Sequence, residues 1–219
     1  MSFIYLMPGN WFELKNINPD KIYPYSMDSF KEEILNQVNS RSEKLELINS
    51  SFGSKRNNNI VESITFHLDD KKFSSMINML ADEKRHPIIT FHGTSLEAVN
   101  SILATGYIIP GSGKNKMDVI IKTHGSMYGT GIYSSPFFDK AMQYTTATTA
   151  KYVYILINVV FLGTMKLIPP NTKLTDFKLP INGKYSDNSN TRIVYGLEQL
   201  ISADSEKIIP IAVMKIKIA

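Results

Sequence analysis

Residues 88–94 read Ile88-Ile89-Thr90-Phe91-His92-Gly93-Thr94, a short β-type run that ends on a His-Gly-Thr triplet. Residues 124–136 read HGSMYGTGIYSSP, and the part from Tyr128 to Tyr133 predicts a second short strand. The composition of the chain changes at Pro87. We therefore place one domain over residues 88–219 and an amino-terminal extension over residues 1–87.

A helix is predicted directly after the triplet. Thr94 is a suitable N-cap, and Glu97 three residues later would complete a capping box. Gly106 is suited to end the helix. The apolar side of this helix would consist of Leu96, Val99, Ile102 and Leu103.

The rest of this domain reads as short strands with a second helix. Ser135 and Pro136 form an N-cap and first-turn pair for a helix that runs to about Thr145. The apolar run over 152–162 predicts a mostly buried strand, and strand-like runs follow near 191–202 and 208–218. Short strands with two intervening helices favour an α+β domain over a doubly wound sheet.

The extension over 1–87 carries two amphipathic patterns. The first predicts a helix from about Ser29, and the second predicts a helix from about Lys72 to Glu83. Their apolar faces are Phe30, Ile34, Leu35 and Val38 in the first and Phe73, Met76, Ile77 and Leu80 in the second. The extension contains no pattern with known chemistry, so we expect it to be structural or to dock a target.

Composition excludes several classes of site. Of the 219 residues, 43% are apolar and 20% are charged, which predicts an ordinary folded core. The net charge of +4 comes from scattered residues, so it does not indicate a nucleic-acid patch. The absence of cysteine excludes a disulfide framework, a Cys-ligated metal and a Cys nucleophile.

The four histidines show no metal-ligand spacing, so we expect no metal. The first residues lack the basic and apolar regions of a signal peptide, and the most apolar segment, 152–162, is too short to span a bilayer. We expect a monomer without membrane contact, either cytoplasmic or secreted as an effector that acts in a host cytosol.

Taken in order, the segments 91–94, 129–136 and 140–144 resemble the catalytic core of the poly(ADP-ribose) polymerase family. The spacing of eleven residues between Tyr133 and Tyr144 also resembles the diphtheria-toxin-type transferases. The similarity covers about 88–218 and is closest to mono-ADP-ribosylating branches. It implies an ADP-ribosyltransferase fold, in which two small, mostly antiparallel sheets bind NAD in the cleft between them.

The resemblance assigns NAD-binding roles to the triplet. Gly93 would present its backbone N–H and C=O to the nicotinamide amide, and its missing Cβ permits that approach. The side chain of His92 would hydrogen-bond a ribose hydroxyl of the adenosine half. Thr94 completes the predicted binding motif.

The resemblance also assigns roles to three residues of the second block. Tyr133 and Tyr144 would face each other across a slot for nicotinamide, whose positive ring favours aromatic faces. Lys140 lies one helical turn before Tyr144 and would contact the ribose, the pyrophosphate or a catalytic carboxylate. Ala141 departs from many relatives, which have a serine there that contacts the carboxamide.

Two alignments compete for the catalytic acid that the family places at the start of a late strand. If the run from Arg192 is matched to that strand, the position is Thr191 and the acid is missing. If the run from Glu198 is matched, Glu198 is the acid, and its distance to Pro210 fits the family within one residue. We prefer Glu198, which would stabilise the cationic transition state. Glu198→Ala should then abolish nicotinamide release and leave NAD binding largely intact.

The sequence therefore predicts an NAD-dependent mono-ADP-ribosyltransferase that modifies a protein and releases nicotinamide, with His92, Tyr133 and Glu198 as its catalytic residues. Two alternatives keep the same pocket: a catalytically silent relative that binds NAD or ADP-ribose, and an NAD glycohydrolase with water as acceptor. An alternative from a different class is a basic nucleic-acid-binding module.

Overall fold

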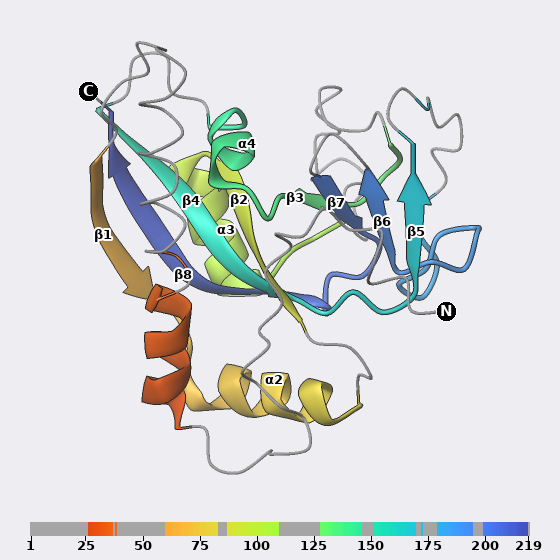
Figure 1. The fold of residues 1–219 in the computed structure, drawn as a ribbon, viewed down its shortest axis with the longest axis horizontal. Helices are drawn as coiled ribbons and strands as arrows, with labels where there is room; N and C mark the ends of the chain where they lie inside the picture. The colour runs from red at the N-terminus through yellow and green to blue at the C-terminus, as the bar shows by residue number, and fades with distance from the viewer. Residues whose placement is uncertain are drawn as a thin grey trace.

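The strands lie in two four-stranded sheets, at the left and the right of Figure 1. The structure is a computed structural model, and it describes residues 26–36, 38, 60–82, 87–109, 128–145, 151–169, 172, 179–194 and 199–218. The predicted α+β class with two mostly antiparallel sheets is confirmed.

The first sheet has the strand order β1-β8-β4-β2 and is antiparallel throughout. Its strands are β1 (Ile60–Phe66), β8 (Ile208–Lys217), β4 (Tyr152–Val160) and β2 (Ile88–Thr94). The two central strands, β4 and β8, are buried along most of their length because side chains cover both faces. This explains why the sequence of β4 is almost continuously apolar rather than alternating.

The second sheet has the order β3-β7-β6-β5 and consists of short strands. These are β3 (Ile132–Ser134), β7 (Gln199–Ser202), β6 (Thr191–Val194) and β5 (Met165–Ile168). β5 and β6 are parallel, and the other pairs are antiparallel. The predicted run over 191–202 is thus two paired strands, β6 and β7, rather than one.

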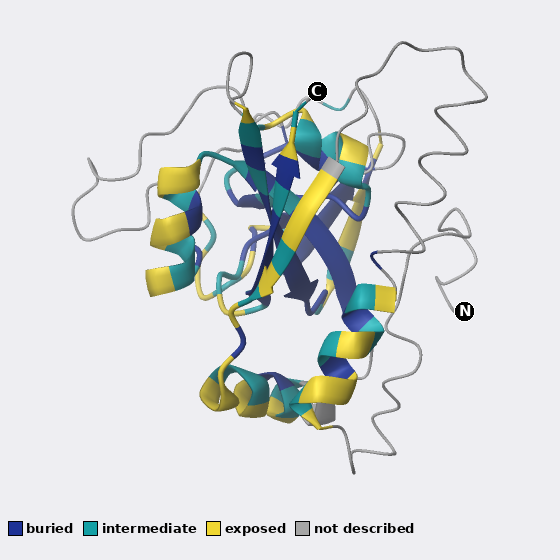
Figure 2. Cartoon of the chain, turned by 90° about the vertical axis from the view of Figure 1, so that its left-hand side faces the viewer, coloured by how far each residue is buried: buried dark blue, intermediate teal, exposed yellow. Residues whose placement is uncertain are grey.

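Apolar side chains join the two sheets. One buried cluster contains Leu156 from β4, Ile132 from β3 and Leu200 from β7, together with Val99 from helix α3 (Leu96–Thr105). Each fully buried side chain of this size contributes roughly 1.5–3 kcal/mol. In Figure 2 the central strands of the first sheet are buried, β1 is mostly exposed, and the helices are exposed on their outer sides. The cluster therefore fixes the two sheets against each other.

The N-cap predicted for the first helix is wrong by one residue. β2 continues through the triplet, and Thr94 pairs with Tyr154 in the ladder to β4. The backbone turns only at Ser95, whose Oγ accepts a hydrogen bond from the N–H of Ala98. The predicted end is confirmed, because Gly106 has a φ of +79° and donates its N–H to the carbonyl of Ile102.

The second helix is shorter than predicted. Ser135 remains extended because it forms an antiparallel bridge with Phe91, through two backbone hydrogen bonds of 2.6 and 2.9 Å. The helix, α4 (Phe138–Met142), therefore begins after Pro136, and Ser135 caps the N–H of Phe137 instead. This bridge connects the first sheet to the chain that enters α4.

Both predicted amino-terminal helices are present, over 27–36 and in α2 (Asp70–Asp82). They pack on the first sheet through Phe30, Ile34 and Met76. β1 was not predicted. It belongs to the amino-terminal extension and pairs with β8, which belongs to the predicted domain. The boundary at residue 87 stays a prediction, but the first sheet includes strands from both sides of it. In the part of the chain that the structure describes, no helix is long and apolar enough to cross a membrane.

Candidate active site

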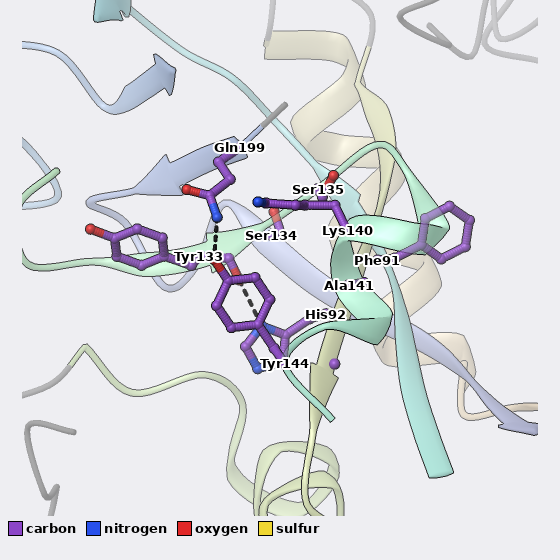
Figure 3. Close-up of a pocket in the computed structure, with 10 residues that line it drawn as sticks. Phe91, His92, Tyr133, Ser134, Ser135, Lys140, Ala141, Tyr144 and Gln199 are labelled. Atoms are coloured by element: carbon purple, nitrogen blue, oxygen red, sulfur yellow. Dashed lines mark hydrogen bonds between the residues drawn. The ribbon is translucent and has the colours of Figure 1, made fainter. Parts of the chain in front are cut away.

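A pocket lies where the first sheet, the second sheet and α4 meet (Figure 3). It brings together five of the residues predicted to bind NAD: His92, Gly93, Tyr133, Lys140 and Tyr144. The other described residues that line it are Phe91, Ser134, Ser135, Ala141 and Gln199. Segments that are far apart in the sequence thus form one site.

Gly93 lies on an open edge of the first sheet. β2 is the last strand of that sheet, and Phe91 directs its N–H and C=O outward to Ser135. In an antiparallel ladder, residues two apart direct their backbone groups to the same side. The N–H and C=O of Gly93 therefore point to the same open edge, where they suit the two hydrogen bonds of a planar amide.

Gly93 is also required by the packing of α4. A Cβ placed on Gly93 would clash with the carbonyl oxygen of Ala141, which lines the pocket. The predicted close approach of a ligand is one reason for glycine at this position. The close approach of α4 to β2 is a second reason. A larger residue at this position would force α4 away from β2.

His92 is held in one tautomer. Its Nδ1 lies 2.6 Å from the carbonyl oxygen of Tyr133, which can only accept a hydrogen bond, so Nδ1 carries the proton. Desolvation lowers the pKa of His92 below its ordinary value of 6.5 and outweighs the effect of this bond, which raises it. The ring is therefore neutral near pH 7, and Nε2 is an acceptor suited to a hydroxyl group.

His92 also contacts a buried polar pair, Tyr107 and Asn158. The ring of Tyr107 contacts His92 edge-on, with ring centroids 5.4 Å apart. The hydroxyl of Tyr107 donates a 2.9 Å hydrogen bond to Oδ1 of Asn158 on β4. His92 is thus held by contacts with both Tyr133 and Tyr107.

Tyr133 reaches back into the turn that precedes it. Its hydroxyl donates to the carbonyl of Gly129 at 2.7 Å and accepts from the N–H of Tyr128 at 3.1 Å. Desolvation raises the pKa of this hydroxyl above its ordinary value. Tyr133 is therefore neutral, and the turn fixes the direction of its ring.

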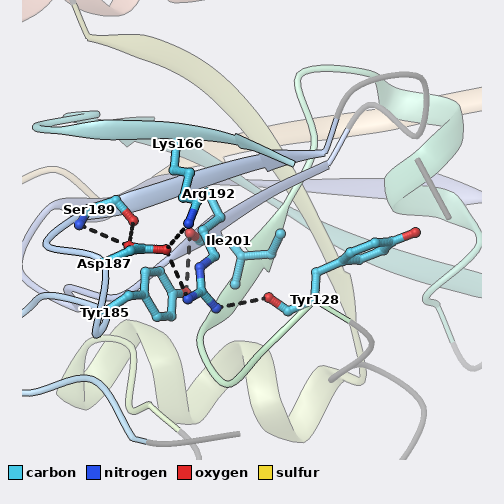
Figure 4. Close-up of polar contacts among 7 residues, drawn as sticks. All are labelled: Tyr128, Lys166, Tyr185, Asp187, Ser189, Arg192 and Ile201. Atoms are coloured by element: carbon cyan, nitrogen blue, oxygen red, sulfur yellow. Dashed lines mark hydrogen bonds and ion pairs between the residues drawn. The ribbon is translucent and has the colours of Figure 1, made fainter. Parts of the chain in front are cut away.

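A buried cation also contacts this turn, at Tyr128 (Figure 4). Arg192 of β6 donates to the carbonyl of Tyr128 at 3.3 Å and pairs with Asp187 at 3.2 Å. Its guanidinium lies 3.8 Å from the centre of the Tyr185 ring, and its side chain is only 4% exposed. Lys166 forms a second ion pair with Asp187 at 3.0 Å. This cluster holds the second sheet and the Tyr128 turn together.

Lys140 lies in α4, and Tyr144 lies in the turn that follows α4. Tyr144 is 43% exposed and accepts a hydrogen bond from Nε2 of Gln199 on β7. Lys140 is the only charged residue among the described residues that line the pocket. A positive pocket of this kind favours an anionic group such as a pyrophosphate.

Three residues considered in the sequence analysis are not among the described residues that line the pocket. Thr94 is one of them, although it follows Gly93 directly. Thr191 begins β6 opposite Ser202, at the far end of the β6–β7 pair from Gln199. Glu198, the preferred catalytic acid, lies outside the described residues.

Among the described residues, no group of three His, Asp or Glu could hold a metal ion.

Sequence reasoning missed Gln199. Its one signal is its position beside Glu198 at the start of a strand-like run. The pairing of β7 with β3, which brings Gln199 beside the chain that follows Tyr133, cannot be read from a single sequence.

The comparison with known families agrees with this geometry. Residues 49–216 match the family described as the poly(ADP-ribose) polymerase catalytic domain. No match to the chain was found among curated protein sequences. Enzymes with this domain are ADP-ribosyltransferases that use NAD as a substrate. Since the match extends over more than half of the 219 residues, the chain belongs to the poly(ADP-ribose) polymerase catalytic domain family.

Proposed function

We propose that the pocket binds NAD and transfers its ADP-ribose to a protein. The observation that carries this proposal is the convergence of the open backbone edge of Gly93, the neutral His92 and the ring of Tyr144 in one small site. Gly93 would pair with the nicotinamide amide, and Nε2 of His92 would accept a ribose hydroxyl of the adenosine half. Lys140 would contact the ribose or the pyrophosphate.

The chemistry is a substitution at the ribose. The bond between C1′ of the ribose and the nicotinamide nitrogen breaks, and its electron pair leaves with nicotinamide, which becomes neutral. C1′ carries the positive charge in the transition state. A nucleophile of the acceptor then bonds to C1′ and releases its proton. Gly93 and the tyrosines would hold the leaving group in line, which lowers the entropic part of the barrier.

We propose that a single ADP-ribose unit is transferred and that the acceptor is a protein. The resemblance of residues 124–136 to mono-ADP-ribosylating branches supports a single transfer. The group that stabilises the cation is predicted from the sequence to be Glu198, which lies outside the described residues and stays a prediction.

The proposal is tested by incubating the whole chain with NAD that carries a label in its adenosine half, in the presence of a protein extract. We expect nicotinamide release together with label on protein, one unit per site by mass spectrometry. Nicotinamide without labelled protein would indicate a glycohydrolase, and NAD binding without release would indicate a silent relative. A protein that neither binds nor cleaves NAD would contradict the proposal.

A further inference from the structure

Gln199 is a polar residue of the pocket for which the predicted NAD contacts give no role. It is the first residue of β7 and is only 5% exposed. In the ladder between β7 and β3, Ile201 lies opposite Tyr133. Because side chains alternate along a strand, Gln199 shares the face of Ile201 and Tyr133. Its amide therefore extends into the pocket from the second sheet (Figure 3).

The amide of Gln199 crosses the pocket to the first sheet's side. Its Nε2 donates to the hydroxyl of Tyr144, which lies in the turn after α4 at the pocket's exposed side. A glutamine amide has two donor hydrogens and a carbonyl acceptor. The bond to Tyr144 uses one donor, so a second donor and the acceptor are available to a molecule in the pocket.

We propose that Gln199 is the residue of β7 that contacts the substrate, by hydrogen-bonding the hydroxyls of the ribose that carries nicotinamide. This inference rests on the function proposed above. The contacts of Gly93 hold one side of that ribose through nicotinamide, and those of His92 hold the distant adenosine end. Gln199 enters between them from the opposite sheet, and its neutral amide matches hydroxyl groups, which both donate and accept.

A neutral contact has a consequence for the rate. As nicotinamide leaves, positive charge develops at C1′, and a carboxylate nearby would stabilise it through a full charge. An amide offers only a dipole, and Lys140 adds a positive charge to the same pocket. We therefore expect the pocket to bind NAD but to release nicotinamide slowly.

The experiment uses two substitutions at Gln199 in the whole chain. Gln199→Leu removes the hydrogen bonds at similar volume, and we expect NAD to bind about 2- to 10-fold more weakly in calorimetry, the usual worth of one neutral hydrogen bond. Gln199→Glu adds a charge at nearly constant shape, and we expect nicotinamide release to accelerate about tenfold or more. Asn78→Asp makes the same amide-to-carboxylate change on the exposed face of α2 and should match the wild type.

A second comparison separates contact with the substrate from support of Tyr144. Tyr144→Phe keeps the ring and removes the hydroxyl that Gln199 contacts. If Gln199 touches the substrate, Gln199→Leu weakens NAD binding in the Tyr144→Phe background as well. An effect of Gln199→Leu that disappears in that background would reduce Gln199 to a support for Tyr144 and overturn the proposal.

Failure of this inference differs from failure of the proposed function. A wild type that binds NAD, with both Gln199 variants unchanged in affinity and rate, would refute the role of Gln199 alone. Loss of nicotinamide release in Glu198→Gln, with no gain in Gln199→Glu, would place the contact at Glu198 instead. A wild type that binds NAD without releasing nicotinamide, and gains release in Gln199→Glu, supports the inference. No NAD binding by any variant would refute the function itself.

Discussion

Nδ1 of His92 lies 2.6 Å from the carbonyl oxygen of Tyr133. The strand β3, which carries Tyr133 and borders the proposed nicotinamide site, therefore orients His92. The two ends of the predicted NAD site are thus linked by one hydrogen bond between the sheets. A change in β3 would move His92 as well as Tyr133.

The burial of His92 gives it a defined effect on pH dependence, because desolvation lowers its pKa more than the bond to Tyr133 raises it. Because the pKa of His92 is lowered in the folded protein, the unfolded chain takes up a proton first as the pH falls below 6.5. We expect the free energy of unfolding to decrease as the pH falls below that value. Urea unfolding at several pH values measures this effect. In His92→Gln the decrease over the same pH range should be smaller, and an identical pH profile would contradict the assignment.

Gly93→Ala should remove NAD binding. The added methyl group would clash with the carbonyl of Ala141, so α4 would shift and carry Lys140 and Tyr144 with it. Gly106→Ala is the matched control: its Cβ meets no atom within 4 Å, and only its φ of +79° is unfavourable. With a ψ of 179°, Gly106 lies in a region that almost only glycine adopts, so that control should lose about 1–3 kcal/mol of stability and keep its affinity for NAD. Calorimetry and thermal unfolding of both variants test the difference.

Arg192→Met should lower the free energy of unfolding by roughly 1–3 kcal/mol, because it removes the buried partner of the Tyr128 carbonyl. Asp187 keeps its ion pair with Lys166 in this variant. Lys166→Met should cost less than about 1 kcal/mol, since the Lys166 side chain is 49% exposed. Denaturant unfolding measures both. Equal losses in the two variants would show that the burial of Arg192 does not decide its contribution.

The same cluster predicts behaviour in acid. Partial burial alone raises the pKa of Asp187, but hydrogen bonds from Ser189 and Lys166 and the charge of Arg192 outweigh it and hold the pKa well below its ordinary 3.8. The stability that this carboxylate contributes is therefore present above pH 3.8 and is lost as the pH falls further. Asp187→Asn should be less stable near neutral pH and should approach the wild type in acid, measured by unfolding at each pH.

Tyr107→Phe should cost about 1–3 kcal/mol, because it leaves Oδ1 of the fully buried Asn158 without its hydrogen bond. Tyr154→Phe makes the same change on β4 where, among the described residues, no hydrogen bond of the hydroxyl is seen, so its cost should be small. Thermal unfolding compares the two. NAD affinity should change little in either variant, since Tyr107→Phe keeps the ring that contacts His92.

The sequence predicted the parts of the site that local patterns encode. His92, Gly93 and Tyr133 lie in short motifs, and α2, β4 and β8 follow from apolar periodicity. Features set by pairing between distant segments were not predictable. The bridge between Phe91 and Ser135 delays α4, and the ladder between β7 and β3 brings Gln199 to the pocket. The ladder through Thr94 likewise moves the helix cap to Ser95.

The short second sheet was the hardest part to predict for a related reason. β5 and β6 each have four residues, which is too few for a periodic pattern to stand out. Arg192, a charged residue inside β6, argues against a buried strand until its partners Asp187 and Tyr185 are known. Only the assembled structure explains why that charge is tolerated.

The strand order β1-β8-β4-β2 also constrains when the protein can fold during synthesis. β8 lies between β1 and β4, but it leaves the ribosome after all the other described strands, since it begins at Ile208. Until then β1 has no neighbour in the sheet, and the edge of β4 that pairs with β8 stays open. Such open edges favour aggregation, so yield in cells should depend on chaperones that cover the nascent chain.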